Sequence, residues 1–248
     1  MVWRGAMSGL ALPPGGVPRS WRRLLQRVRR ARALRARAAL EGHRPLRIVS
    51  WNLLRLTGAT EDDVVRLIRR HHPDILLMQE ATKAMDTLPE RVGGQYWRTL
   101  LPGRIHGLAV WTRHALAEPP RVLPLQPGTV FERVCQIVEL DGVGIANVHL
   151  SHGQVLNRRQ LRRIAKALPE RAAVLGDYNL VGPVLLPGFD DVGPRAPTHV
   201  MGELVPLRLD RCLVRGLSCL TREVLPRRHS DHRPILVNLV PAEARAAA

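Results

Sequence analysis

The hydrophobic and polar positions of the chain change their pattern at residue 46. From there on, short apolar runs alternate with polar loops, which is typical of buried strands. Two segments, 61–72 and 154–168, instead repeat apolar residues every three to four positions and are predicted to be amphipathic helices. Asp141-Gly142 separates two apolar runs and is a signal for a two-residue hairpin. The predicted strands are 46–50, 74–78, 108–112, 133–140, 143–150, 172–175, 207–214 and 234–240.

The order of these elements indicates the fold class. Strands outnumber helices, and hairpins are mixed with stretches in which strand and helix alternate. So many apolar strands need two packed sheets to bury their inner faces. The sequence therefore predicts an α/β chain built as a β-sandwich that is covered by helices.

Residues 1–44 differ in texture from the rest of the chain. Residues 1–19 are rich in Gly and Pro, whereas 20–40 place Trp21, Leu24 and Val28 on one side of a predicted helix and Arg on the other. An Arg-rich amphipathic helix can lie on an anionic membrane or on nucleic acid. It can equally be a solvated helix packed on the domain, or sequence upstream of the true start. We predict a tail at 1–44, one domain at 45–241 and a disordered C-terminus at 242–248.

The formal net charge of +17 is unevenly distributed. Residues 1–44 hold eleven Arg and a single Glu, so the remaining 204 residues carry a net charge of +7. A basic balance is compatible with a polyanionic partner. More than half of it lies outside the predicted domain, so the charge is only weak support for nucleic acid binding.

The apolar runs and the cysteines bear on location. No run of about 18 apolar residues exists, and the N-terminus lacks the apolar core of a secretory signal. Cys135, Cys212 and Cys219 form no C-x-x-C pair and are typical of buried thiols in a reducing compartment. We expect a cytoplasmic monomer, either free or peripheral to the membrane or the nucleoid.

Polar side chains that suit a metal ion and a phosphate gather at or beside the ends of the predicted strands. Loops at strand ends hold functional groups on a rigid scaffold. Carboxylates bind Mg²⁺, amides and imidazoles can hold phosphate oxygens, and a His paired with a carboxylate can move a proton. The set comprises Asn52, Glu80, His149, Asp177, Asn179, Asp231 and His232, together with Asp210, which lies within its predicted strand.

Six short motifs around these residues resemble the ordered motif series of the endonuclease/exonuclease/phosphatase superfamily. They are Ser50-Trp51-Asn52, Met78-Gln79-Glu80, Asn147-Val148-His149-Leu150, Gly176-Asp177-Tyr178-Asn179, Leu209-Asp210-Arg211 and Ser230-Asp231-His232-Arg233-Pro234. Each motif alone is weak, but six in the right order form a specific signature over residues 46–240. The resemblance implies a four-layer α/β-sandwich, with two mixed sheets face to face and helices outside, and a catalytic domain at 45–241.

The resemblance also implies a metal site and a catalytic pair. Glu80 is similar to the family's principal metal ligand, with Asn52 beside it and Asp231 as a further ligand or a contact to the metal's water. The implied cofactor is Mg²⁺, with Mn²⁺ as the second candidate. His232 resembles the family's catalytic His and Asp210 its orienting carboxylate. We expect adjacent strands to bring these two side chains together.

Further roles are implied for the residues around the attacking water and the substrate. Asp177 is placed like the Asp that orients or deprotonates the water, and either Asp177 or His232 is the general base. His149 and Asn179 resemble contacts to phosphate oxygens. Two substrate-binding candidates are Thr198, in a Pro-Thr sequence similar to one of the family, and Arg113, which follows a predicted strand.

Other interpretations of the same residues stay open. The histidines at 149, 152, 229 and 232 raise the possibility of zinc, but their spacing fits no helix motif and the carboxylates and amides favour a harder ion. The predicted reaction is hydrolysis of a phosphate ester by in-line attack of an activated water. The basic charge slightly favours nucleic acid as substrate, and the helix at 20–40 favours lipid-linked or small-molecule phosphates. A catalytically inactive binding module on the same fold is the remaining alternative, against which the intact polar set argues.

Overall fold

The computed structural model describes residues 44–128, 132–201 and 204–242. The predictions for the tail helix at 20–40 and for residues 243–248 lie outside the described residues. Within the described part of the chain, no helix is long and apolar enough to cross a membrane.

Two six-stranded mixed sheets form the centre of the domain. The first sheet has the order β13 (Leu217–Val224), β14 (Ile235–Pro241), β1 (Leu46–Asn52), β2 (Ile75–Ala81), β4 (Gly107–Thr112), β3 (Gln95–Leu100). The second has the order β5 (Arg121–Pro124), β6 (Val134–Leu140), β7 (Val143–His149), β8 (Ala172–Asp177), β12 (Asp210–Arg215), β9 (Asp190–Asp191). A separate hairpin joins β10 (His199–Met201) to β11 (Val205–Leu207). The helices are α2 (Glu61–His71), α3 (Leu88–Val92) and α4 (Gln154–Ala167), with short 3₁₀ turns η1 (Arg55–Thr57) and η2 (Lys83–Met85).

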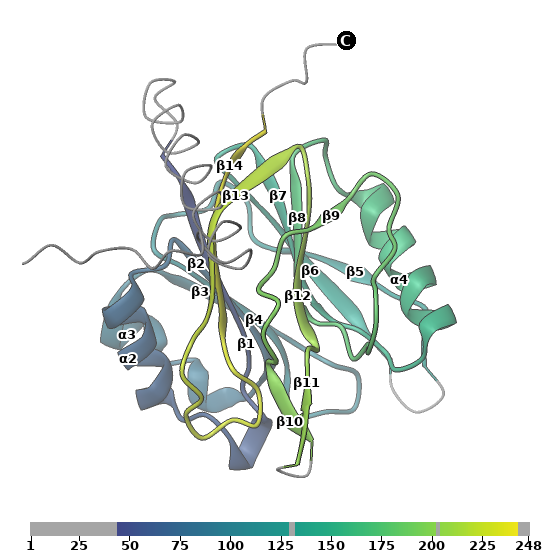
Figure 1. Cartoon of the computed structure of the whole chain (residues 1–248). Helices are drawn as coiled ribbons and strands as arrows, with labels where there is room; N and C mark the ends of the chain where they lie inside the picture. The colour runs from purple at the N-terminus through teal and green to yellow at the C-terminus, as the bar shows by residue number, and fades with distance from the viewer. Residues whose placement is uncertain (1–43, 129–131, 202–203, 243–248) are drawn as a thin grey trace, which may run out of the picture. The chain divides into compact units, whose positions relative to one another are not determined.

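Three apolar clusters separate the layers of the domain. Ile48 of β1 and Leu175 of β8 belong to the cluster between the two sheets. Trp51 of β1 points to the other face and packs in a cluster with Leu67 of α2. Leu161 of α4 packs on the outer face of the second sheet. Figure 1 shows α2 and α3 beside the first sheet and α4 beside the second, so the predicted four-layer α/β-sandwich is confirmed.

Most of the predicted strands and both predicted helices are confirmed in their core positions. The hairpin is confirmed as well, because Leu140 pairs with Val143 and both turn residues, Asp141 and Gly142, have positive φ. The strand predicted at 207–214 is wrong in extent. β11 ends at Leu207 and β12 begins only at Asp210, where the chain passes from the small hairpin into the second sheet.

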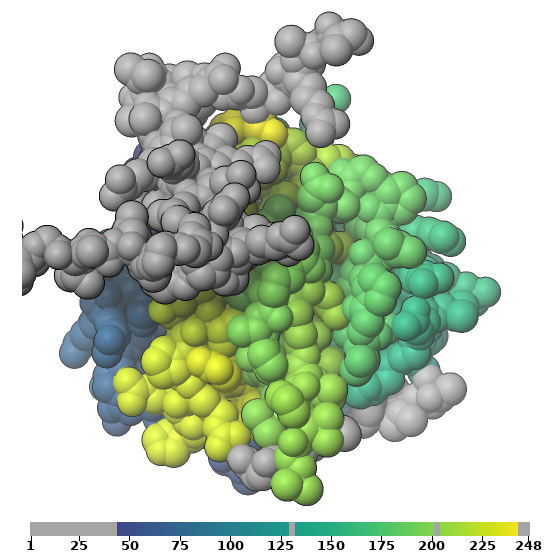
Figure 2. Space-filling view, viewed as in Figure 1, coloured from purple at the N-terminus to yellow at the C-terminus, as the bar shows by residue number. Residues whose placement is uncertain are grey.

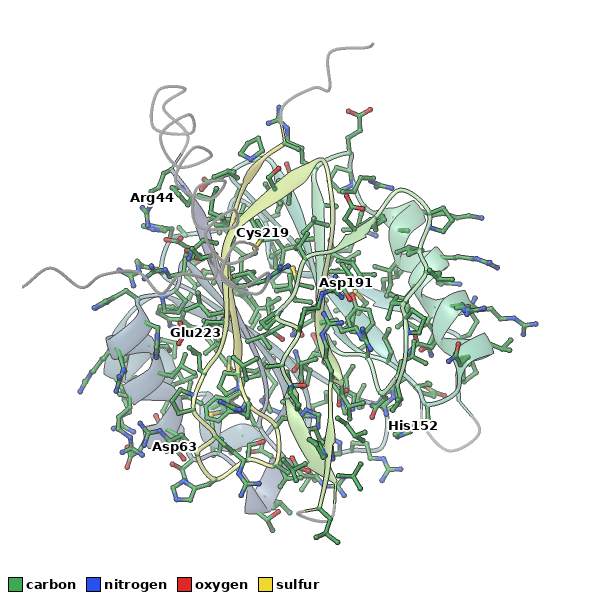
Figure 3. The ribbon with its side chains drawn as sticks, in the orientation of Figure 1. Arg44, Asp63, His152, Asp191, Cys219 and Glu223 are labelled. Atoms are coloured by element: carbon green, nitrogen blue, oxygen red, sulfur yellow. The ribbon has the colours of Figure 1, made fainter. Side chains whose placement is uncertain are left out.

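The strand directions place many loop segments at one end of the domain. β1 and β2 run parallel, as do β7 and β8, so each pair delivers its last residues to the same edge. The β10–β11 hairpin reaches this end too, because His199 bridges to His232 just before β14. Figure 2 shows the hairpin and the loop before β14 side by side. In Figure 3, Asp63 and His152 lie toward this end and Arg44 lies toward the other.

A buried polar network lies between the two sheets, directly beneath this end. Gln79 of β2 donates to Asn147 Oδ1 of β7 at 2.7 Å and to Ser50 Oγ of β1 at 3.2 Å. The Asn147 amide donates in turn to the carbonyl oxygens of Met78 and Ala109, at 3.1 and 3.0 Å. Buried polar groups cost free energy unless they are paired, so this network fixes how the two sheets meet. Gln79 therefore supports the residue that follows it, Glu80, rather than contacting the pocket.

We expect Asn147→Ala to lower the free energy of unfolding by roughly 2–4 kcal/mol, because the Gln79 amide and the Met78 carbonyl would lose their buried partner. Urea unfolding measures the change. Asn238→Ala, at a half-buried position on β14, is the matched control and should cost less, since water can replace the lost bonds there. Equal losses in the free energy of unfolding at the two positions would show that the buried network contributes no more to stability than the half-buried bonds of Asn238.

Candidate active site

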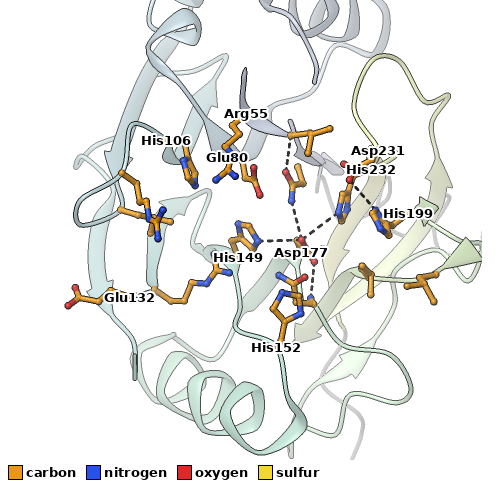
Figure 4. Close-up of a pocket in the computed structure, with 18 of the residues that line it drawn as sticks. Arg55, Glu80, His106, Glu132, His149, His152, Asp177, His199, Asp231 and His232 are labelled. Carbon is orange, nitrogen blue, oxygen red and sulfur yellow. Dashed lines mark hydrogen bonds and ion pairs between the residues drawn. The ribbon is translucent and has the colours of Figure 1, made fainter. Parts of the chain in front are cut away.

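A cavity of about 680 Å³ opens between the ends of the two sheets. The strand ends described above deliver polar side chains to it from both sheets. Figure 4 shows Glu80, His149, Asp177 and His232 around the same space. The predicted site residues that line it are Asn52, Glu80, His149, Asp177, Asn179, Asp231 and His232.

Glu80 enters this cavity because β2 is irregular at its end. The ladder to β4 shifts register between Met78 and Ala81, so Gln79 and Glu80 together oppose the single residue Leu108. Glu80 has a φ of 57°, a left-handed conformation that costs a residue with a side chain roughly 1–3 kcal/mol. A bulge of this kind redirects a side chain at a strand end. Here it turns into the cavity a carboxylate that simple strand alternation would point to the helical face.

Asp177 occupies the middle of the cavity. Its Oδ2 accepts a hydrogen bond from Asn52 Nδ2 at 3.1 Å, and its Oδ1 accepts from the Asn179 N–H at 2.8 Å. The same Oδ2 lies 3.5 Å from His149 Nε2 and 3.7 Å from His232 Nε2. Burial would raise the pKa of Asp177, but the two histidines and the Asn179 N–H outweigh it and hold this pKa below its usual value. Asp177 is therefore a fixed, ionised acceptor.

The close approach of two strands explains why a glycine, Gly176, precedes Asp177. β7 and β8 approach so closely that a Cβ at Gly176 would lie 1.9 Å from the carbonyl oxygen of Val148. Its φ of 146° is also a conformation that residues with side chains rarely adopt. The glycine thus lets β8 bring Asp177 level with His149, its ladder partner on β7.

Asp210 and His232 form a buried pair. Asp210 Oδ2 lies 2.8 Å from His232 Nδ1, so the predicted contact is present. The route to it differs from the prediction, because the strands are not adjacent: β12 belongs to the second sheet and β14 to the first. The pair therefore links the two sheets. Burial alone would lower the pKa of His232, but the carboxylates of Asp210 and Asp177 outweigh it and raise this pKa to about 10.

His149 and Asn179 have partners that limit their freedom. Burial lowers the pKa of His149 to about 3, with Asp177 opposing the shift, so its imidazole is neutral near neutral pH. Asn179 has a φ of 48° and donates from Nδ2 to the carbonyl oxygen of Leu150 at 3.0 Å. Both side chains line the cavity and can reach a bound phosphate from there.

The carboxylates of the cavity fit a divalent cation. Asp231 Oδ1 is buried and has no hydrogen-bond partner within the described residues. Burial raises the pKa of Glu80; Arg55 opposes the shift, and Asp177 and Asp231 add to it. Carboxylates that repel one another in a partly desolvated cavity are stabilised by a hard cation with oxygen ligands.

A second donor set lies beside Asp231. One ligand atom from each of His199, Asp231 and His232 falls within 4.8 Å of the others. One ring nitrogen of His232, Nδ1, already contacts Asp210 at 2.8 Å. The carboxylates are therefore the stronger candidate ligands for a cation. The residues present thus fit Mg²⁺ or Mn²⁺, with the oxygen donors on Glu80 and Asp231.

The loop that carries Asp231 and His232 is anchored to the start of α2. Asp63 Oδ2 lies 2.6 Å from His229 Nδ1 and also accepts from the Thr60 N–H, which completes a capping box at the helix N-terminus. Burial would raise the pKa of Asp63, but its bonds to His229, Thr60 and Arg66 outweigh it and lower this pKa to about 2. The cap of α2 therefore also positions the site loop.

We expect Asp63→Asn to destabilise the protein by roughly 1 kcal/mol near neutral pH, because the carboxylate of the capping box in the first turn of α2 loses its charge. The folded pKa of about 2 lies below the unfolded value, so the unfolded chain binds more protons between them. The stabilisation from Asp63 is therefore present above about pH 4 and lost as the pH falls toward 2. Urea unfolding of parent and variant along an acid series should show their difference shrinking; a constant difference would contradict a role for the charge.

The comparisons with known proteins agree with this geometry. Residues 49–232 match the endonuclease/exonuclease/phosphatase family. The chain belongs to this family. No protein in the search of curated proteins matches the sequence.

Solved structures of family members share the fold. A family protein from Bacteroides vulgatus is 16% identical, with a TM-score of 0.69 over 81% of this chain and 100% of that one. D. rerio TDP2, in complex with a single-strand DNA product, is 16% identical, with a TM-score of 0.63 over 79% of this chain and 99% of that one. A mannosyl-6-phosphatase from Bacteroides thetaiotaomicron is also 16% identical, with a TM-score of 0.61 over 79% and 99% of the two chains. At these identities the likeness establishes the fold alone.

Two of the site residues predicted for this family member are placed elsewhere. Arg113 is exposed and donates to the carbonyl oxygen of Pro73. β4 runs antiparallel to β2, so a residue after β4 lies at the end where β2 begins, away from Glu80. The prediction that Arg113 binds substrate is therefore corrected.

Thr198 is also not at the surface of the cavity. Its side chain is fully buried, and its Oγ1 accepts from the backbone N–H groups of Leu209 and Asp210 at 3.1 and 3.0 Å. The substrate-binding prediction is thus corrected to a positioning role: the hydroxyl holds the start of β12, where Asp210 begins.

Several residues of the cavity were missed in the sequence. Arg133 is 6% exposed and lines the cavity just before β6, while Arg55, Arg104 and His106 line it from loops of the first sheet. Burial lowers the pKa of Arg133, and Asp177 and Glu80 oppose the shift. The sequence did contain a signal for Arg133, which opens the first strand of the predicted hairpin. In a hairpin, the start of the first strand lies at the same edge of the sheet as the end of the second strand. Arg55 and Arg104 lie in loops, and no pattern in the sequence indicated that they line the cavity.

Proposed function

We propose that this protein is a divalent-metal-dependent hydrolase of phosphate esters. The observation that carries the proposal is the position of Asp177, between two histidines and beside the carboxylates of Glu80 and Asp231, at the open end of the two sheets. Membership of the family supports phosphoester chemistry on this fold. A binding module would have no use for so many buried and mutually repelling polar groups.

Several residues of the chain have separate roles in the in-line attack of water on the phosphate ester. Asp177, fixed by Asn52 and the Asn179 N–H, is the acceptor for the proton of the attacking water. His232 faces Asp177 through Nε2 and Asp210 through Nδ1, and two carboxylates favour its charged form. As an imidazolium it donates to a phosphate oxygen in the transition state. The roles that the sequence predicted for these residues stay predictions.

Phosphate oxygens have further donors in the cavity. Arg133 presents a buried guanidinium, and His149 and Asn179 line the same space. Glu80 and Asp231, with Asn52 beside them, would hold Mg²⁺ or Mn²⁺. When bound, the ion supplies a Lewis acid that neutralises phosphate charge and acidifies water.

A nucleic acid substrate remains one candidate, as the sequence predicted. Arg55, Arg104 and Arg133 line the cavity and suit a phosphodiester backbone. Against it, the lining in the described part of the chain contains no Phe, Tyr or Trp ring on which a base could stack. Lipid-linked and small-molecule phosphates are the other candidates, and they need no such ring.

The test is product release from a panel of esters: bis-para-nitrophenyl phosphate, single- and double-stranded DNA, a phosphosugar and a phosphatidylglycerol vesicle. Each is incubated with Mg²⁺, Mn²⁺ or Zn²⁺ in water enriched with ¹⁸O. We expect hydrolysis with Mg²⁺ or Mn²⁺ and the label in the phosphate product, because water attacks phosphorus. Absence of hydrolysis with every ester and metal would instead favour an inactive binding module.

A further inference from the structure

Most of the exposed large apolar side chains of the described residues lie on segments at the end of the domain where the cavity opens. Val122 of β5, 42% exposed, and Leu185, 65% exposed in the segment that leads to β9, are exposed apolar residues outside this group. Five of those near the mouth define what we name the apolar rim. They are Leu56 (76% exposed), Ile105 (62%), Val155 (67%), Val181 (61%) and Leu204 (85%).

The topology explains why these positions share one end. Leu56 follows β1, Val155 opens α4 after β7, and Val181 follows β8, so each comes after a strand that ends at the cavity. Ile105 lies between β3 and β4, and β4 starts where β2 ends. Leu204 lies in the turn of the β10–β11 hairpin, which begins beside His232. The rim is therefore contributed by five separate segments that share the end of the domain where the cavity opens.

Cationic side chains lie next to residues of the apolar rim. Arg55 precedes Leu56 and Arg104 precedes Ile105, and both arginines line the cavity. Lys83, just after β2, is exposed at the same end, as is Arg228 in the loop before β14. Aliphatic side chains beside Lys and Arg are the composition of a surface that lies on a bilayer, with apolar groups among the acyl chains and cations at the lipid phosphates.

Other partners fit this surface less well. A single-stranded nucleic acid would be held by aromatic rings, and a protein interface is enriched in Tyr, Trp, Phe and Met. The rim is purely aliphatic, and its members lie on five segments at the end of the domain where the cavity opens. A surface of this kind would set the cavity against the headgroup layer, where the phosphate of a lipid could enter it.

We propose that the apolar rim docks this protein on an anionic membrane surface and that the phosphate ester it hydrolyses belongs to a lipid. The proposal rests on the proposed function, because it names the substrate class of the same site. Val181 is the one rim residue that lines the cavity, so the variants are made at Leu56 and Ile105, which do not line it and lie outside the catalytic set.

The experiment measures hydrolysis of soluble bis-para-nitrophenyl phosphate by the full chain while vesicles are added. Docking by the rim would cover the cavity, so vesicles of phosphatidylcholine with phosphatidylglycerol should inhibit hydrolysis of the soluble ester. The double variant Leu56→Ser, Ile105→Ser should need about tenfold more lipid, or more, for the same inhibition, since two apolar side chains are removed from the interface. Its rate without vesicles should equal that of the parent.

Val122→Ser is the matched control, an exposed Val outside the rim, and should leave the inhibition unchanged. Binding of the parent to vesicles without inhibition would overturn the proposal, because attachment would then come from another part of the chain. Equal inhibition of parent and double variant would also overturn it, as would inhibition by DNA that the double variant relieves. Failure of the proposed function is a separate result, in which the parent does not hydrolyse the soluble ester at all.

Discussion

His232→Ala is expected to lower kcat by about 10²–10⁴-fold, because the variant loses the donor that faces both Asp177 and the phosphate. Asp210→Asn should cause comparable damage, since an amide cannot stabilise the charged imidazole through Nδ1 in the same way. The double variant should be little worse than either single one, because the two residues act as a unit. Single-turnover rates on a soluble phosphodiester measure all three.

A purely structural pair would behave differently. Breaking a buried ion pair costs several kcal/mol of stability, and this pair links the two sheets. Thermal melts of the same samples separate the two effects. His114→Ala, at an exposed imidazole near Asp74, is the matched control and should change neither the rate nor the melting temperature. A large loss of melting temperature with a near-normal rate in the folded fraction would remove His232 from the chemistry.

Glu80→Gln is expected to lower kcat by about 10²-fold or more and to weaken Mg²⁺ binding strongly, because a neutral oxygen replaces the carboxylate that the bulge presents to the cavity. The fold should stay intact, since the substitution keeps the shape of the side chain. Calorimetric titration with Mg²⁺ and rates at rising Mg²⁺ concentration check both effects. Glu139→Gln, at an exposed position of β6, controls for the loss of one negative charge. Equal Mg²⁺ affinities for Glu80→Gln and the parent would exclude Glu80 as a ligand.

The sequence predicted the inner strands well because their burial leaves a clear pattern. β1, β7 and β8 are buried on almost every residue, and their apolar runs are unmistakable. Edge strands leave no such signal. β3 and β5 are half-buried or exposed along their length, and β13 carries a bulge between Cys219 and Thr221 that breaks its alternation. These edge strands were missed because exposure in β3 and β5, and the bulge in β13, leave no continuous apolar run or regular alternation.

The residues of the site could be predicted from the sequence motifs, but the backbone geometry and strand topology that bring them together could not. The positive φ of Glu80 depends on the bulge opposite Leu108, which no local pattern announces. Arg113 was misplaced because the sequence does not say which way β4 runs beside β2. Asp210 and His232 were paired correctly from the motif series, although the contact crosses between sheets and not along one. Contacts between distant segments follow from topology, which composition and periodicity do not determine.

The central claim is that Asp177 and a divalent ion act together in this cavity. The most direct measurement is hydrolysis of bis-para-nitrophenyl phosphate by the full chain as Mg²⁺ is added, chelated and added again, with Asp177→Asn run in parallel. We predict that activity appears with Mg²⁺, disappears on chelation and returns on re-addition. Folded Asp177→Asn protein should be slower by about 10²-fold or more at every Mg²⁺ concentration. Activity that survives chelation, or a variant as fast as the parent, would contradict the account.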